Sequence, residues 1–214
     1  MDQQKIREWN LAYILDHWIR VAVLVILIFT GFFISRPFIA GGPSMSWMRF
    51  LHFFCGYILI LGLVVRMYLA FRSSFYADWK DFSIIRILKN IPDIAGYYLF
   101  LKKTHKDYQR YNPLQALSYL FTGVMILVSA VTGFALYHGN VFLFIKAPAA
   151  FEWVNTLLGG ESYTRIWHIL IMWYFIIFTL IHVYMAVMNS LINRDGALGS
   201  MITGYKTSRH RNDL

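Results

Sequence analysis

Cysteine is almost absent from this chain, with Cys55 the only one among 214 residues. A single cysteine excludes an intramolecular disulfide framework, and the chain has no CxxCH motif for covalent haem attachment. It also excludes the thiolate clusters that hold iron–sulfur centres or the nickel and iron of a redox enzyme. Any metal chemistry in this chain must therefore use other ligands.

Charged residues are also scarce, at 14% of the chain, whereas 58% of the residues are hydrophobic and the mean hydropathy is +0.50. Soluble domains do not combine so much apolar content with so little charge. The net charge of +9 could suggest nucleic acid, but the basic residues flank apolar spans, as membrane topology requires. We therefore expect a polytopic membrane protein with no nucleic-acid partner.

The apolar runs predict an all-α membrane protein, a bundle of four transmembrane helices that uses the whole chain, 1–214, as one domain. The expected spans are 17–35, 47–71, 114–137 and 164–190. The last is the clearest, because 28 residues without Asp, Glu, Lys or Arg follow Arg165, and roughly 20 suffice to cross a bilayer. The N-terminus has no short apolar core followed by a small-residue cleavage site, so we expect the first span to be retained.

A long charged segment, 72–112, separates the second and third spans. A helical spacing recurs in it at Phe82, Ile85, Leu88 and Lys89. We expect an amphipathic helix at the membrane interface there, broken near Pro92.

Lysine and arginine are distributed unevenly between the loops. The N-terminal part with Arg20 holds three, the long middle loop eight and the tail after Ser190 four, whereas the two remaining loops together hold four. The positive-inside rule places both termini and the long loop in the cytoplasm.

Four histidines lie in the spans or at their ends. His168 and His182 are 14 positions apart, which on a helix is about 40° short of four full turns and about 21 Å along the axis. Both imidazoles therefore leave nearly the same face, one near each side of the membrane. With the expected orientation, His17 and His182 lie near the inner face, and His52 and His168 lie near the outer face.

Ionisable side chains at membrane depth are costly and are candidates for function. Two facing imidazoles can hold a haem iron from both axial positions, which favours electron transfer because no position is left for oxygen. Zinc would want four close ligands, often with thiolate, and two histidines per level do not supply them. The alternative is that some histidines only hydrogen-bond across helices. Four histidines at matched levels favour two haems.

Glycines and arginines stand at positions that suit such a site. Gly31 is 14 residues after His17, and Gly56 is one turn after His52, and a porphyrin needs gaps of this kind, although glycines also serve close helix packing. Arginines could pair with haem propionates, or could simply extend to the headgroups. The candidates are Arg20, Arg49, Arg66 and Arg165.

The order of the four histidines on spans one, two and four resembles the di-haem cytochrome b subunits of membrane-bound nickel–iron (uptake) hydrogenases, which are related to the gamma subunit of formate dehydrogenase. The resemblance covers almost the whole chain. Its specific pieces are DHW around His17, RFLHFFCGYILILGLVVRMYLAF around His52, RYNPLQAL, VTGFALY, the fourth span and GSMITGYK. The last four favour the hydrogenase branch.

The resemblance implies a membrane anchor in the bacterial inner membrane, not itself catalytic for hydrogen chemistry. Such subunits accept electrons at the periplasmic face from an iron–sulfur cluster of the hydrogenase small subunit, which accompanies the large subunit. They pass the electrons through two haems b to a quinone, menaquinone or ubiquinone. In relatives an asparagine before the third span lies near the quinone. The matching residue is Asn112, with Gln115 one turn on, although from the residues alone Asn112-Pro113 is only a helix start.

One departure from the family pattern concerns the inner haem. Relatives commonly carry an arginine three residues before the first histidine, but Ile14 occupies that place and Asp16 directly precedes His17. Arg20 or Arg66 would then have to supply the propionate contact.

Two other functions remain open at this point. The chain could serve formate dehydrogenase or another periplasmic dehydrogenase as its cytochrome b subunit. It could also be a haem-free membrane anchor or transporter, in which the histidines pack or relay protons.

Overall fold

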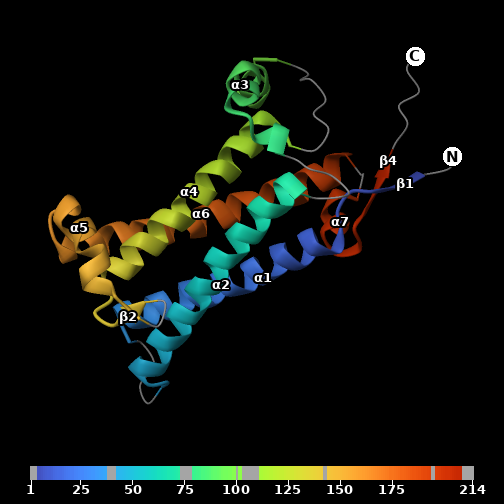
Figure 1. The fold of residues 1–214 in the computed structure, drawn as a ribbon. Coiled ribbons are helices and arrows are strands. Elements are labelled where there is room, and N and C mark those ends of the chain that lie inside the picture. The colour runs from blue at the N-terminus through green and yellow to red at the C-terminus, as the bar shows by residue number, and fades with distance from the viewer. Residues whose placement is uncertain are drawn as a thin grey trace. The chain divides into compact units, whose positions relative to one another are not determined.

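The computed structural model is mostly helical and describes residues 4–37, 42–72, 79–99, 101–102, 111–141, 144–193 and 196–208. Among these residues, four helices are long and apolar enough to cross a membrane, with mean hydropathies from 1.8 to 2.3. They are α1 (Leu11–Ser35), α2 (Met45–Arg72), α4 (Pro113–Ala135) and α6 (Glu161–Asn193) (Figure 1). The four expected helices are therefore present, and the structure moves their ends by up to six residues.

The first helix begins earlier than the hydropathy pattern indicates because Asn10 caps it. The Asn10 side chain accepts a hydrogen bond from the Tyr13 backbone N–H at 3.0 Å, which satisfies one of the unpaired N–H groups of the first turn. Asp16 interrupts the apolar run, so hydropathy alone starts the span at 17. The helix continues through Asp16 because Arg20, one turn on, pairs with its carboxylate.

The chain divides into two compact units, of which unit 1 comprises Met1–Gly62 and Arg165–Leu214, and unit 2 comprises Leu63–Thr164. In unit 1, α1 runs antiparallel to α6. Phe32 near the end of α1 meets Trp173 in the first half of α6, with ring centres 5.8 Å apart. The prediction of one domain over the whole chain stays a prediction.

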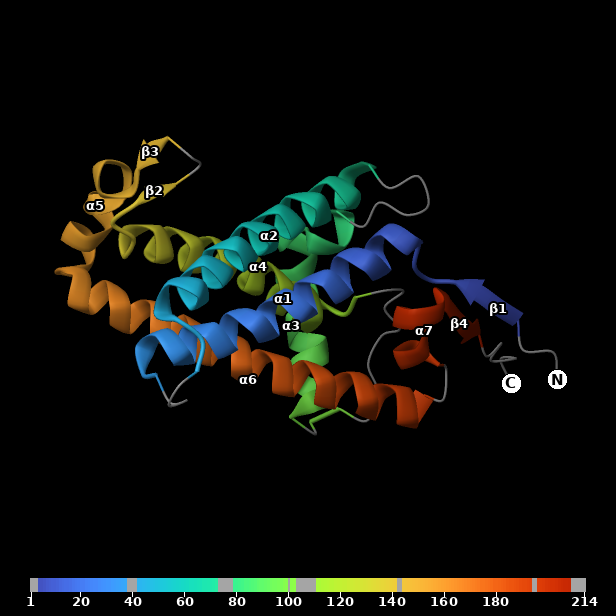
Figure 2. The same ribbon diagram turned by 90° about the horizontal axis from the view of Figure 1, so that it is seen from below.

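The two ends of the chain are joined in unit 1 by a small antiparallel ribbon. Strand β1 (Gln4–Arg7) pairs with β4 (Tyr205–Ser208), and the short helix α7 (Ala197–Thr203) leads into it (Figure 2). Gly204 adopts a φ of 81°, and a Cβ there would lie 2.9 Å from the Trp9 carbonyl oxygen. The mostly helical structure confirms the predicted all-α fold, and the sequence gives no local pattern for this short ribbon, because its two strands come from opposite ends of the chain.

Two tryptophan side chains bind α7, the helix that leads into this ribbon, to the start of α1 and the residue that precedes its cap. Trp9 Nε1 donates to Ser200 Oγ at 3.2 Å, and Trp18 Nε1 donates to the Met201 carbonyl at 2.7 Å. Ser200 is buried, with 1% of its surface exposed. These bonds place α7 against the end of α1 that carries His17.

Unit 2 holds α4 together with the shorter elements between the spans. These are η1 (Trp79–Phe82), α3 (Ile84–Tyr98), β2 (Asn140–Val141), β3 (Ile145–Lys146) and α5 (Ala147–Leu158). The two short strands form an antiparallel hairpin. Asn155 on α5 donates from Nδ2 to the Ala135 carbonyl at 3.1 Å, which ties α5 to the last turn of α4.

The helix expected in the long charged segment is α3, but it is not broken near Pro92. Proline lacks the N–H that would bond the carbonyl one turn earlier, which costs a helix about 3 kcal/mol. Ile87 and Ile94, on either side of Pro92, are 1% and 0% exposed. They are seven residues apart and share one face, so burial on both sides of the proline keeps the helix continuous.

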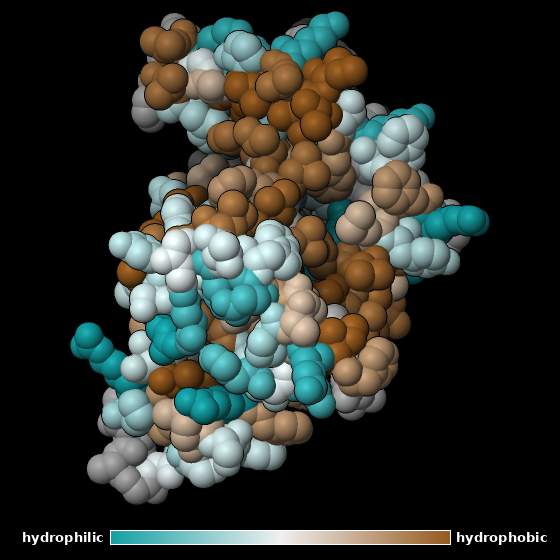
Figure 3. Space-filling view, turned by 60° about the vertical axis from the view of Figure 1, so that its left-hand side comes forward, coloured by the Kyte–Doolittle hydropathy of each residue, from teal (hydrophilic) through white to brown (hydrophobic). Residues whose placement is uncertain are grey.

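Large apolar side chains cover much of the surface of the spans. Leu15, Val25, Leu61 and Leu180 are each more than half exposed, and Figure 3 shows extensive brown areas of hydrophobic side chains. A soluble protein rarely leaves such areas uncovered. Exposed apolar helices of this length are typical of contact with lipid.

Candidate functional site

Two pairs of histidines meet in unit 1. The ring of His17 on α1 lies 6.3 Å from that of His182 on α6, centre to centre, with the planes inclined by 52°. The ring of His52 on α2 lies 6.3 Å from that of His168 on α6, with the planes inclined by 64°. The structure thus brings together the two pairs that the sequence predicts, at the two ends of the 14-residue interval on α6.

The separation of the rings fits two imidazoles on opposite sides of one metal ion. A bond from a metal to an imidazole nitrogen is about 2 Å long, and the centre of the ring lies about 1.2 Å from its atoms. Two opposed ligands therefore have centres about 6.4 Å apart. A direct hydrogen bond of about 2.9 Å between ring nitrogens would bring the centres to about 5.3 Å. Both pairs match the first arrangement and not the second.

The donor set agrees with a haem iron better than with a metal bound by protein ligands alone. Within the ranges that the structure describes, no three His, Cys, Asp or Glu side chains gather closely enough to hold a metal ion. Zinc needs three or four protein ligands. A porphyrin brings its own nitrogen ligands and needs only the two axial histidines.

Glycines provide space beside the pair formed by His52 and His168, which we call the outer pair. A Cβ at Gly31 would lie 3.5 Å from His52 Cε1, and a Cβ at Gly56 would meet no described atom within 4 Å. Gly31 thus lies against the His52 ring, at the level where the sequence places it, and Gly56 faces open space. A planar macrocycle beside the imidazoles needs such gaps.

Aromatic side chains hold the pair formed by His17 and His182, which we call the inner pair. Trp18 meets the His17 ring edge-on, with centres 5.4 Å apart. Phe178 stacks on the His182 ring at 5.8 Å, with planes inclined by only 16°. These contacts restrict both rings and orient them within unit 1.

An ion pair lies directly beside the inner pair. Arg20 Nη2 is 2.5 Å from Asp16 Oδ2, and the Asp16 side chain is only 5% exposed. Gly62 on α2 gives the arginine room, because a Cβ there would lie 2.8 Å from Arg20 Cγ. Asp16 therefore accepts from two donors of Arg20, Nη2 to its carboxylate and Nε to its backbone carbonyl, and the propionate role of Arg20 stays a prediction.

The other three arginine candidates are Arg49, Arg66 and Arg165. Arg49 and Arg165, each three residues before an outer-pair histidine, are exposed. Arg66 belongs to unit 2, where its guanidinium lies over the Phe82 ring at 5.4 Å. Their propionate roles stay predictions.

The two candidate quinone residues form a capping box at the start of α4. The Gln115 backbone N–H donates to Asn112 Oδ1 at 2.8 Å, and the Asn112 backbone N–H donates to Gln115 Oε1 at 3.1 Å. Pro113 occupies the first turn, where its missing N–H costs nothing. Both side chains thus have a structural role, and their quinone role stays a prediction.

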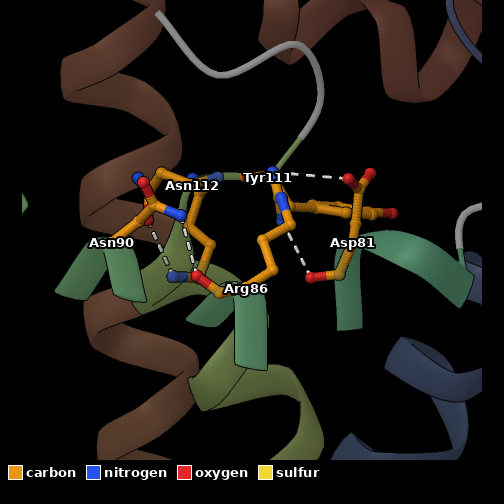
Figure 4. A network of polar contacts seen from close by, with 6 residues as sticks. Asp81, Arg86, Asn90, Tyr111 and Asn112 are labelled. Carbon is orange, nitrogen blue, oxygen red and sulfur yellow. Dashed lines mark hydrogen bonds and ion pairs between the residues drawn. The ribbon is translucent and has the colours of Figure 1, made fainter. Parts of the chain in front are cut away.

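Arg86 on α3 holds the chain just before this cap. Its guanidinium donates to the carbonyl oxygens of Asp81 at 2.8 Å and Tyr111 at 3.1 Å, and lies 3.3 Å from Asp81 Oδ1 (Figure 4). Asn90 Nδ2 donates to the Arg86 carbonyl at 2.8 Å. The sequence gives no signal for this network, because an arginine in a basic loop is usually solvated.

Tyr98 adds a hydroxyl beside Asn112. Burial raises the pKa of Tyr98 above its usual range, Tyr97 raises it further, and a hydrogen bond with the Asn112 side chain opposes part of the shift. Tyr98 therefore stays protonated at neutral pH and can donate a hydrogen bond at this junction.

A comparison with protein families identifies the chain. The family model described as "Prokaryotic cytochrome b561" matches residues 8–204. The chain belongs to the prokaryotic cytochrome b561 family. Membership makes it a haem b protein of electron transport and, with its four apolar helices, a multi-pass protein of the bacterial inner membrane.

Curated relatives are similar over nearly their full length. A protein of Azotobacter vinelandii is 32% identical, covering 95% of this chain and 92% of its own, and one of Rhizobium leguminosarum bv. viciae is 30% identical, covering 100% and 93%. Both are named "Probable Ni/Fe-hydrogenase B-type cytochrome subunit". A protein of Escherichia coli K12, named "Probable Ni/Fe-hydrogenase 1 B-type cytochrome subunit", is 27% identical over 90% of this chain and 87% of its own.

The sequence of this cytochrome does not reveal the contacts of two polar residues near the histidine pairs. Asp16 looks like the end of a lead-in, yet it is buried against Arg20. Thr30 looks like an ordinary residue of an apolar span, yet it is fully buried and contacts His52. The position of Thr30 could have indicated this contact, because Thr30 is 13 residues after His17 and about 14 residues separate the two histidine levels on a helix.

The geometry at Gly31 predicts a size limit at the outer pair. Gly31→Ala should leave haem content near the wild-type value, because the added Cβ makes ordinary contacts at 3.5 and 3.6 Å. Gly31→Leu should displace the His52 ring and lower the occupancy of the outer haem at least about tenfold, as disturbed ligand orientation does. Haem per chain in the purified protein measures both.

A matched control is Gly199→Leu in α7, where no described atom lies within 4 Å of a new Cβ. This variant should bind haem normally. Equal haem content in Gly31→Leu and Gly199→Leu would show that the space at Gly31 does not serve the cofactor.

Proposed function

We propose that this chain is the cytochrome b subunit and membrane anchor of a nickel–iron hydrogenase, and that it passes electrons from hydrogen oxidation through two haems b to the quinone pool. The main support for this proposal is that two histidine pairs, with the same 6.3 Å separation of ring centres, lie at two levels of α6. The names of the relatives support the hydrogenase as the donor.

The two histidines of each pair would hold one haem through its iron. Haem b, when bound, supplies a one-electron carrier, and two imidazole ligands leave no coordination position for oxygen. His168 and His182 fix both levels on one helix, about 21 Å apart along its axis. A rigid helix therefore sets the spacing of the two carriers, and α1 and α2 each contribute the opposing ligand.

The orientation expected from the positive-inside rule places the outer pair toward the periplasm. The hydrogenase small subunit, with its iron–sulfur cluster, would then dock at that face, and the large subunit would lie beyond it. Electrons that move inward against the membrane field would store about 2.3 kcal/mol per charge per 100 mV. The hydrogen chemistry itself lies in those partners, because one cysteine cannot build their metal centres.

Reduction of the quinone, menaquinone or ubiquinone, is assigned to the junction at Asn112 and Gln115. The cap occupies Asn112 Oδ1, whereas an amide also carries two N–H donors that suit a quinone carbonyl. Tyr98 offers a further donor at the same junction. Arg20, Arg49, Arg66 and Arg165 remain the proposed partners of the haem propionates.

The test uses membrane vesicles that contain the complete complex and measures hydrogen-dependent reduction of added quinone. His17→Ala and His182→Ala should lower the rate to background, whereas hydrogen oxidation with a soluble dye acceptor at the hydrogenase should persist. Asn112→Ser, which keeps a capping oxygen but lacks the amide, should slow quinone reduction while haem content stays unchanged.

Unchanged quinone reduction in both histidine variants would refute the electron path. A purified complex in which a different dehydrogenase accompanies the chain would keep the path and replace the donor. A folded protein without haem would leave only a membrane anchor.

A further inference from the structure

Thr30 on α1 lies directly behind one ligand of the outer pair. It is completely buried, and its Oγ1 is 2.8 Å from His52 Nδ1 on α2. The contact joins two different helices at the level of the outer pair. The contacting ring nitrogen is Nδ1, so Nε2 is the His52 nitrogen left to bind a metal.

The other partners of Thr30 decide the direction of this hydrogen bond. Thr30 Oγ1 also lies 2.8 Å from the Ile26 carbonyl oxygen and 3.2 Å from that of Leu27. Carbonyl oxygens only accept, so in the arrangement usual for a helical threonine the single hydrogen of the hydroxyl goes to the helix backbone. In that arrangement the hydroxyl accepts from His52, and Nδ1 carries the proton.

A neutral imidazole has one protonated nitrogen. With that proton on Nδ1, Nε2 is the bare nitrogen, which is the form that binds a metal.

We propose that Thr30 is a positioning residue of the outer haem: it holds His52 in the tautomer with Nδ1 protonated and presents Nε2 to the iron. This inference rests on the proposed function of His52 and His168 as axial ligands. Partners of this kind fix the orientation of the ligand ring and raise its basicity, and their loss typically costs 10- to 100-fold in metal affinity.

The experiment compares Thr30→Val, which keeps the shape without the hydroxyl, with Thr30→Ser, which keeps the hydroxyl. Thr132→Val is the matched control, because Thr132 is also buried and its hydroxyl donates to helix carbonyls at 2.8 and 3.1 Å. The complete complex is purified for each variant. Two quantities are measured for each haem: the rate of its release to an excess of apomyoglobin and its midpoint potential. The outer haem is identified as the one that is lost in His168→Ala.

Thr30→Val should release the outer haem about 10- to 100-fold faster than wild type. Its midpoint potential should become more positive, because a less basic ligand stabilises ferric iron less. Thr30→Ser and Thr132→Val should behave like wild type, and the inner haem should be unchanged in all three.

An outer haem with wild-type release and potential in Thr30→Val would overturn the proposal. So would loss of both haems in Thr30→Val, because the hydroxyl would then serve the fold and not His52 in particular. If His52→Ala and His168→Ala each keep the full haem content of wild type, the proposed ligands of the outer haem are themselves wrong, which is a separate result from the failure of Thr30.

Discussion

Replacing either histidine of one pair is expected to remove one haem and to leave the other. His52→Ala or His168→Ala should reduce the content from two haems per chain to one, and His17→Ala or His182→Ala should remove the other. The reason is geometric: ring centres 6.3 Å apart suit two imidazoles that bind one iron between them, and a single remaining histidine would hold the haem only weakly. A dithionite-reduced minus air-oxidised visible spectrum, with haem counted per chain, measures the loss.

The matched control for these variants is His138→Ala. His138 is largely exposed, and its Nε2 lies 3.7 Å from Glu161 Oε2, so it contacts a surface carboxylate and not another histidine. Its replacement should leave both haems in place. Two haems retained in His52→Ala, or an equal loss in His138→Ala, would contradict the assignment of ligands. Loss of both haems in every single variant would indicate that the two sites depend on each other for folding.

Arg20→Ala is expected to lower the free energy of unfolding by about 3 kcal/mol. Asp16, with a side chain 5% exposed, would lose the cation that now lies 2.5 Å away. Removing one member of a buried pair typically costs about 3–5 kcal/mol, and the lower end applies because the Arg20 side chain is 25% exposed. Equilibrium unfolding in mixed detergent micelles measures the change.

The double variant Asp16→Asn, Arg20→Ala separates the two roles considered for Arg20. Without the buried charge, most of the lost stability should return. If Arg20→Ala also loses the haem of the inner pair and the double variant regains it, Arg20 acts on the site through Asp16. If the double variant regains stability but not this haem, Arg20 serves the cofactor directly, in place of the family arginine whose position Ile14 occupies. A single variant as stable as wild type would refute the structural role of the pair.

The sequence by itself determined the membrane class, the four spans and the face on which the histidines lie. These follow from local periodicity: apolar runs set the spans, and 14 residues on one helix bring His168 and His182 back to nearly the same face. The same arithmetic placed Gly31 at the outer level, where the structure finds it against His52. Such features can be predicted without knowing the neighbouring helices, because each depends on one helix alone.

Only the tertiary structure decided which polar groups surround those histidines. Thr30 meets His52 across 22 residues, and the Arg20 side chain lies against Gly62 across 42. The ribbon of β1 with β4 and the continuity of α3 through Pro92 likewise depend on partners distant in sequence. Hydrophobic periodicity is a property of one element, whereas a buried hydrogen bond requires two elements in fixed register, and a single sequence does not encode that register locally.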